Sequence, residues 1–131
     1  MTPILLRPLA RSASVVVFAA IVCTGAVGVV QAEERSPPQR QALLDLAFVL
    51  GESHALRQLC SGEGDQYWRM RMQGLLTAEA PDTYFDRGLK QAFNRGYAAA
   101  QTAYPSCGPE SRDEESRVAQ HGQQLVSQIA R

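Results

Sequence analysis

The sequence predicts an all-α protein, a small bundle of about four helices stapled by one disulfide, after a cleaved N-terminal signal peptide. Three observations favour this fold class. Apolar residues recur at spacings of three and four, and no stretch alternates apolar and polar residues for long enough to predict a strand. Proline and glycine divide the chain into helix-sized segments. The 131 residues, 45% of them apolar, suffice for one domain rather than two.

The first 32 residues have the layout of a secretory signal peptide. Arg7 and Arg11 precede an apolar run over residues 15–30, and Val30-Gln31-Ala32 places small residues where a signal peptidase cleaves. The alternative is a retained membrane anchor, for which this run is shorter than the roughly 20 residues that span a bilayer. We expect cleavage after Ala32 and export to the periplasm. The expected organisation is a signal peptide over residues 1–32, a short linker over 33–37 and a single helical domain over 38–131.

Cleavage would leave two cysteines, Cys60 and Cys107. An even number of cysteines in an exported chain favours a disulfide. The alternatives are two free thiols and a metal site, for which two cysteines without further nearby ligands are too few. A disulfide across this loop would stabilise the fold by about 4 kcal/mol in the chain-entropy model.

The first helix is expected over residues 38–60. Ser36 can cap it, and Pro37-Pro38 suits its first turn. Its apolar residues cover almost the whole circumference, which predicts a central place in the bundle. Gly62 and Gly64 follow, and glycine can adopt the left-handed geometry that ends a helix.

The second and third helices are predicted on either side of Ala80-Pro81. Asp65 can cap a helix that runs to about Glu79, and Asp82 can cap one that runs to Tyr104-Pro105. Glycines within the predicted helices would each cost about 1 kcal/mol relative to alanine, so we expect that some of them let two helices approach closely. They are Gly51, Gly74, Gly88, Gly96 and Gly122.

The fourth helix is expected over about residues 112–130. Ser111 and Glu114 have the spacing of a capping box, and acidic residues crowd the first turn. The apolar stripe of this helix is thin, which predicts loose packing. The disulfide would tie the end of the first helix to the linker before the fourth.

Several runs of residues carry a resemblance to a known family. They are residues 50–60, 65–69 and 93–97, together with Cys107. Over roughly residues 39–107 the chain resembles an uncharacterised family of small exported proteins from alphaproteobacteria, known as a domain of unknown function. The resemblance implies export, a helical fold and the cysteine pair, and it implies no activity.

The composition excludes few functions. Thirteen basic and thirteen acidic residues balance, so the chain has no electrostatic bias toward nucleic acid. No nucleophile motif such as G-x-S-x-G is present. We therefore favour a non-enzymatic binding or structural protein of the cell envelope. Its expected partner is an envelope protein or a cell-wall component, and we expect no nucleic acid, no cofactor and no permanent membrane span after processing.

A binding surface is expected around the second and third helices, because aromatic and arginine residues dominate interaction hot spots. Its residues are Trp68, Arg69, Asn94, Arg95 and Tyr97. The alternative is that Trp68 and Tyr97 fill the core and that Arg95 pairs internally.

Glu52 is the candidate catalytic residue, as the general acid of a small envelope glycan hydrolase. It shares a helix face with Asp45 among apolar residues, and burial raises the pKa of a carboxyl. Glycoside cleavage would need a second carboxylate, for which Asp65 or Glu63 is available. The alternative for Glu52 is a structural ion pair. The possible partners are Arg57, Arg69 and Arg95.

His54 is the candidate ligand of a metal-binding or haem-binding bundle. A bundle could bind haem through a histidine and Met70 or Met72, and a C-x-x-C-H motif for covalent haem is absent. No histidine or carboxylate follows His54 at i+4. A structural histidine is therefore the favoured interpretation, without a metal.

Overall fold

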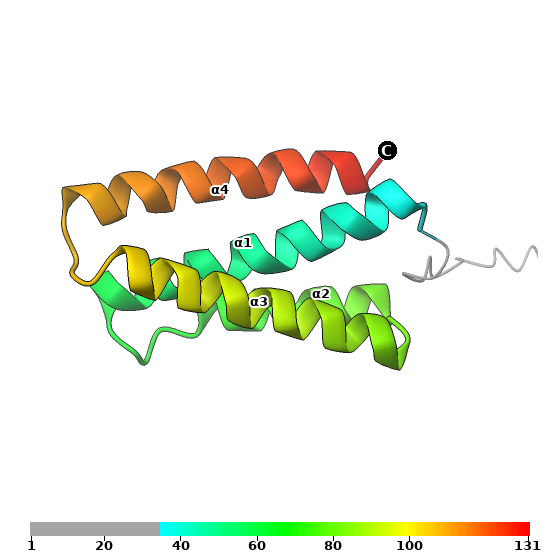
Figure 1. The fold of residues 1–131 in the computed structure, drawn as a ribbon, viewed down its shortest axis with the longest axis horizontal. Helices are drawn as coiled ribbons and strands as arrows, with labels where there is room; N and C mark the ends of the chain where they lie inside the picture. Colours follow the sequence, from blue (N-terminus) through cyan, green and yellow to red (C-terminus); the bar gives the residue numbers. More distant parts are fainter. Residues whose placement is uncertain (1–34) are drawn as a thin grey trace, which may run out of the picture.

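The computed structural model describes residues 35–131, which form four helices and no strand (Figure 1). The predicted all-α bundle is therefore confirmed. The expected signal peptide over residues 1–32 lies outside the described residues. Among those described, no helix is both long and apolar enough to cross a membrane. The helices are α1 (Pro37–Ser61), α2 (Tyr67–Glu79), α3 (Thr83–Ala103) and α4 (Pro109–Ile129).

α1 is the central helix of the bundle, as its apolar circumference predicted. It packs against α2, α3 and α4, and its contacts with α3 and α4 are the most extensive. α3 runs in the same direction as α1, whereas α4 runs in the opposite direction along another side (Figure 1). The most deeply buried large side chains of the bundle are Leu43, Leu56 and Leu89.

Local capping explains where α1 ends and where α3 begins. Gly62, with a φ of 98°, ends α1, and its backbone N–H donates to the carbonyl of Gln58 at 2.8 Å. Asp82 Oδ1 accepts the backbone N–H groups of Tyr84 and Phe85 at 2.7 and 2.9 Å. The predicted cap of the third helix is therefore confirmed.

The other two helices begin at residues that differ from the prediction. α2 begins two residues after Asp65, whose Oδ1 accepts the backbone N–H of Tyr67 at 3.1 Å. α4 begins at Pro109, because Gly108 is the N-cap residue and proline suits the first helical position. The expected capping box that starts at Ser111 is therefore wrong. The Ser111 hydroxyl lies within the first turn and hydrogen-bonds the N–H and carbonyl of Gly108, both at 3.0 Å.

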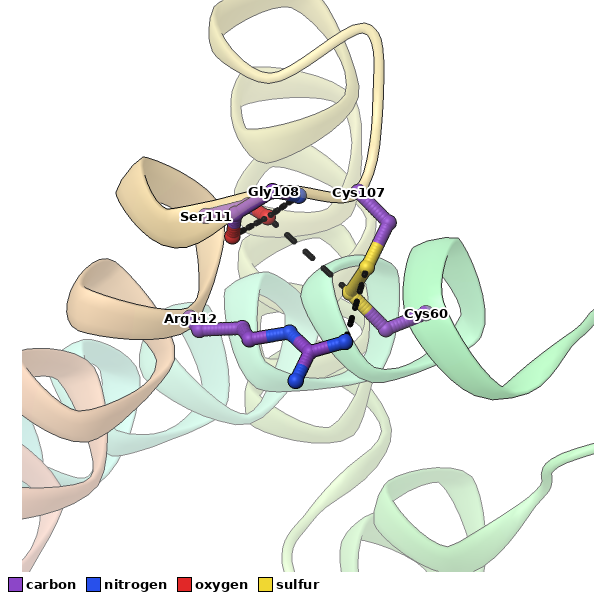
Figure 2. The surroundings of a disulfide bond; sticks show 5 residues. All are labelled: Cys60, Cys107, Gly108, Ser111 and Arg112. Atoms are coloured by element: carbon purple, nitrogen blue, oxygen red, sulfur yellow. Dashed lines mark hydrogen bonds between the residues drawn. A yellow bond between two sulfur atoms is a disulfide. The ribbon is translucent and has the colours of Figure 1, made fainter.

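Cys60 and Cys107 form the predicted disulfide, with their Cα atoms 5.1 Å apart. Figure 2 shows the bond beside the first turn of α4, where Arg112 Nη2 lies 3.9 Å from Cys107 Sγ. The disulfide fixes the start of α4 against the end of α1. α4 packs on α1 through a narrow stripe in which Val118 and Leu125 are buried, whereas Val126 is 51% exposed.

α1 and α3 approach closely at two glycines. A Cβ at Gly51 would lie 2.0 Å from the carbonyl oxygen of Phe93, and a Cβ at Gly96 would lie 2.0 Å from that of Phe48. No side chain fits at such a distance, so the expected packing role is confirmed for these two glycines. Gly74 of α2, by contrast, faces open space.

Arg35 joins three parts of the fold. Its Nε and Nη2 donate to the two carboxylate oxygens of Glu79 at 3.1 and 2.9 Å, and its Nη1 donates to the carbonyl of Ile129 at 3.1 Å. Glu79 is only 6% exposed, so the guanidinium neutralises a buried charge. We call this arrangement the Arg35 clamp. It holds the ends of α2 and α4 against the start of α1.

Candidate functional site

A cavity of about 650 Å³ lies between α2 and α4 and over α1. We call it the α2–α4 groove. Its lining is predominantly apolar, which suits a ligand that avoids water. Leu46, Val49 and Leu50 line it from α1, Trp68 and Leu75 from α2, and Val126 from α4.

Polar groups are few in the α2–α4 groove. Among the described residues, Arg71 is the only charged one that lines it. The Arg71 guanidinium donates to Tyr67 Oη at 3.0 Å and lies 5.0 Å from the centre of the Tyr67 ring. Within residues 35–131, Arg71 forms no ion pair. Ser53, Trp68 and Gln123 are the other polar residues that line the groove. The indole N–H of Trp68 is buried and has no hydrogen-bond partner among the described residues.

A second cavity, of about 450 Å³, lies between α1 and α4. We call it the Glu52 cleft. It is lined by Asp45, Glu52, Glu114, Arg117 and His121, among others. Burial raises the pKa of Glu52, the charge of Glu114 raises it further, and His121 acts in the opposite direction. No hydrogen bond or ion pair joins the Glu52 carboxylate to another residue in the described part of the chain.

The Glu52 cleft contains only some of the carboxylates named from the sequence. Asp45 and Glu52 both line it. Asp65 does not, and instead accepts a hydrogen bond from Arg57 Nε at 2.7 Å, which holds the pKa of Asp65 below its usual value. Glu63 lies beside a different cavity. No ion pair with the three arginines proposed as partners of Glu52 is formed within residues 35–131.

Glu114 and His121 complete the cleft from α4, and sequence reasoning did not assign them to a site. They lie seven residues apart, so they share one helix face. This spacing was visible in the sequence. Helix periodicity does not reveal how α4 packs on α1. The sequence therefore could not show that this face meets α1.

His54 is a buried core residue, 1% exposed. Its ring packs against the rings of Phe93 and Tyr97, at centroid distances of 5.7 and 5.4 Å. Neither ring nitrogen has a hydrogen-bond partner in the described part of the chain. Burial lowers the pKa of His54, the charge of Arg69 lowers it further, and Asp65 opposes this shift.

The candidate ligands of a metal or haem lie in different surroundings. Among residues 35–131, no group of three or more His, Cys, Asp or Glu side chains is placed to hold a metal ion. Met70 is 60% exposed and lines the α2–α4 groove, whereas Met72 is buried in the core.

The five residues expected to form one binding surface lie in different surroundings. Trp68 lines the α2–α4 groove. Tyr97 lines a separate cavity of about 260 Å³ near the end of α1, where its hydroxyl donates to Gln58 Oε1 at 2.8 Å. Arg69, Asn94 and Arg95 are exposed. The two aromatic residues therefore face two different cavities.

The comparison with protein families gives one match. A family model described as a protein of unknown function, DUF2385, matches residues 38–131. The matched segment includes α4, which lay outside the resemblance drawn over residues 39–107. No curated protein and no solved structure matches the chain significantly.

Proposed function

We propose that this chain, which belongs to the DUF2385 family of proteins of unknown function, is an exported cell-envelope protein that binds a small apolar ligand. The observation that carries the binding role is the α2–α4 groove, a cavity of about 650 Å³ with an apolar lining. Small-ligand sites typically measure about 300–1,000 Å³ and combine apolar walls with a few polar groups. The groove meets both criteria.

Two features support export. The layout of residues 1–32 is typical of a secretory signal peptide. The Cys60–Cys107 disulfide is a bond that persists in oxidising compartments and is rare in the cytosol. Both features favour a location outside the cytosol.

Mass spectrometry of the protein from fractionated native cells tests export. The expected product is periplasmic, begins at Glu33 and contains an intact disulfide. A chain that retains residues 1–32, or that is recovered from the cytosol with both thiols reduced, would contradict this proposal.

Blocking the α2–α4 groove tests the binding role. Gly74 lines the groove and has no atom within 4 Å of an added Cβ, so Gly74→Phe places a ring in this space. Gly64→Phe is the matched control, because Gly64 also faces open space but does not line the groove. The probe is N-phenyl-1-naphthylamine, an uncharged apolar dye whose fluorescence rises in apolar surroundings.

The wild-type chain and Gly64→Phe should bind one dye molecule per chain, and Gly74→Phe should bind it at least tenfold more weakly. Trp68 is the only tryptophan of the chain, so its fluorescence reports on the same groove. Absence of saturable binding to the wild type, or equal binding to Gly74→Phe, would refute the binding role.

A second candidate function, an envelope glycan hydrolase, is favoured by the Glu52 cleft. The cleft gives Glu52 a raised pKa, as a general acid requires, and places Asp45 and Glu114 on the same cavity as a possible second carboxylate. The assay is release of soluble reducing sugars from purified peptidoglycan. Activity is expected to be lost in Glu52→Gln and retained in Glu63→Gln. If the wild type releases no sugar, this candidate is excluded.

A further inference from the structure

We infer that the ligand of the α2–α4 groove is a free fatty acid whose apolar chain lies over α1 and whose carboxylate pairs with Arg71. This inference rests on the binding role proposed above and names the chemical class of the ligand. Three properties of the groove support it: its charge, a further hydrogen-bond donor near that charge and its size.

The charge of the groove favours an anionic ligand. In the described part of the chain, Arg71 is the only ionisable residue of the lining, and no acidic side chain accompanies it. Arginine has five N–H donors in a planar arrangement that matches a carboxylate. The hydrogen bond to Tyr67 Oη is the only one that the Arg71 guanidinium makes within residues 35–131. Its other donors can therefore bind a ligand carboxylate.

Trp68 supplies a further hydrogen-bond donor from the same helix as Arg71. It precedes Arg71 by three residues, so the two side chains are neighbours on one face of α2. A buried donor without a partner costs about 1–3 kcal/mol. Protein atoms cover this N–H, so a carboxylate oxygen of the ligand would remove the cost only if the indole turns toward the groove.

The size of the groove favours a single extended chain over a helix of a partner protein. The α2 residues that line the groove, 68–78, extend over roughly 15 Å at 1.5 Å per residue. A helix of that length with side chains, about 10 Å in diameter, would occupy on the order of 1,200 Å³. The cavity measures about 650 Å³, roughly half of this volume.

Competition against N-phenyl-1-naphthylamine tests the inference. The protein used is the processed chain, which is expected to begin at Glu33. The three competitors share a ten-carbon chain and differ in their headgroups: decanoate is anionic, decan-1-ol is uncharged and decyltrimethylammonium is cationic. All are used below their micelle concentrations. The wild type should bind decanoate at least tenfold more tightly than decan-1-ol and should bind the cation most weakly.

Two arginine variants assign the preference to a residue. Arg71→Gln should lower the affinity for decanoate at least tenfold and should reduce the preference over decan-1-ol to less than twofold. Arg69→Gln is the matched control, because Arg69 is an exposed arginine of α2 that does not line the groove. It should retain the tenfold preference.

Any different outcome would refute either the fatty-acid inference alone or the binding role as well. Equal affinities for decanoate and decan-1-ol in the wild type, or an unchanged preference in Arg71→Gln, would refute the fatty-acid inference and leave the groove as an apolar site. No saturable dye binding would refute the binding role as well. Sedimentation velocity should give a monomer, whereas a dimer that Gly74→Phe dissociates would show that a second copy occupies the groove.

Discussion

Gly51 of α1 and Gly96 of α3 form a reciprocal contact, in which each glycine faces a backbone carbonyl oxygen of the other helix. A Cβ at either position would lie 2.0 Å from that oxygen. The two helix backbones therefore touch directly, and this contact fixes how α3 packs on the central helix. Backbone atoms cannot move aside as flexible side chains can, so the contact tolerates no added atom.

Alanine at either contact glycine should destabilise the protein. We expect Gly51→Ala and Gly96→Ala each to lower the free energy of unfolding by about 3 kcal/mol, because the overpacking cost exceeds the gain in helix propensity. Gly74→Ala, whose added methyl enters open space, should instead raise it by about 1 kcal/mol. Urea denaturation measures all three. Equal stability of Gly96→Ala and Gly74→Ala would show that the close contact does not exist.

Removal of the disulfide should lower the free energy of unfolding by about 4 kcal/mol, because the bond constrains the unfolded chain between Cys60 and Cys107. The comparison is between the wild type and the Cys60→Ala/Cys107→Ala variant in urea. The reducing agent dithiothreitol should bring the wild type to the stability of the variant. A variant as stable as the oxidised wild type would contradict the predicted contribution.

His54 should make the protein less stable in mild acid. Its pKa is lowered in the folded state by burial, whereas an unfolded histidine titrates near a pKa of about 6.5. Below about pH 6.5 the unfolded chain therefore binds more protons than the folded chain. The stabilisation is complete above this pH and is lost as the pH falls toward the lowered pKa.

The measurement is the free energy of unfolding of three proteins at pH 7.5 and 5.5. His54→Leu should lose part of the pH dependence that the wild type shows between these values. Gly74→Ala changes no titratable group and should keep that dependence. If His54→Leu and the wild type respond equally to pH, His54 is not a buried neutral residue.

Glu52→Gln should stabilise the protein at neutral pH. Burial raises the pKa of Glu52, so between the ordinary value of 4.5 and the raised value the folded chain binds more protons than the unfolded chain. The stabilising effect of this group is present below pH 4.5 and is lost as the pH rises. The gain in Glu52→Gln should be no more than about 1 kcal/mol, since the carboxyl is partly solvated. It should be present at pH 7 and absent at pH 4 in urea denaturation.

Arg35→Ala should lower the free energy of unfolding by about 3 kcal/mol, because it leaves the buried carboxylate of Glu79 without its partner. A second substitution, Glu79→Leu, should restore most of this loss in the double variant. The double-mutant cycle measures the coupling between the two residues. If Arg35→Ala and Glu79→Leu have additive effects, the Arg35 clamp contributes no coupling energy.

Elements set by local signals could be predicted from the sequence. The end of α1 follows from Gly62, and the start of α3 follows from the short side chain of Asp82, each of which acts on its own neighbours in the chain. The start of α4 was missed because two local signals compete there. Gly108 and Pro109 determine it, and Ser111 instead hydrogen-bonds within the turn that they begin.

The candidate sites were harder to predict because they depend on packing. Asp45 and Glu52 were placed on one face by the helix repeat, but Glu114 reaches the same cleft from α4, more than sixty residues later. The α2–α4 groove likewise arises because Trp68 and Val126 flank α1 from two helices far apart in the sequence. No local pattern relates these residues.

The Arg35 clamp indicates that the folded domain starts before residue 38. The family match begins at residue 38, yet the cation that neutralises Glu79 lies three residues earlier. A recombinant fragment trimmed to the family boundary would lack this arginine and would bury an uncompensated carboxylate. Such a fragment would be less stable than the chain that contains Arg35. Processing after Ala32 would keep this arginine.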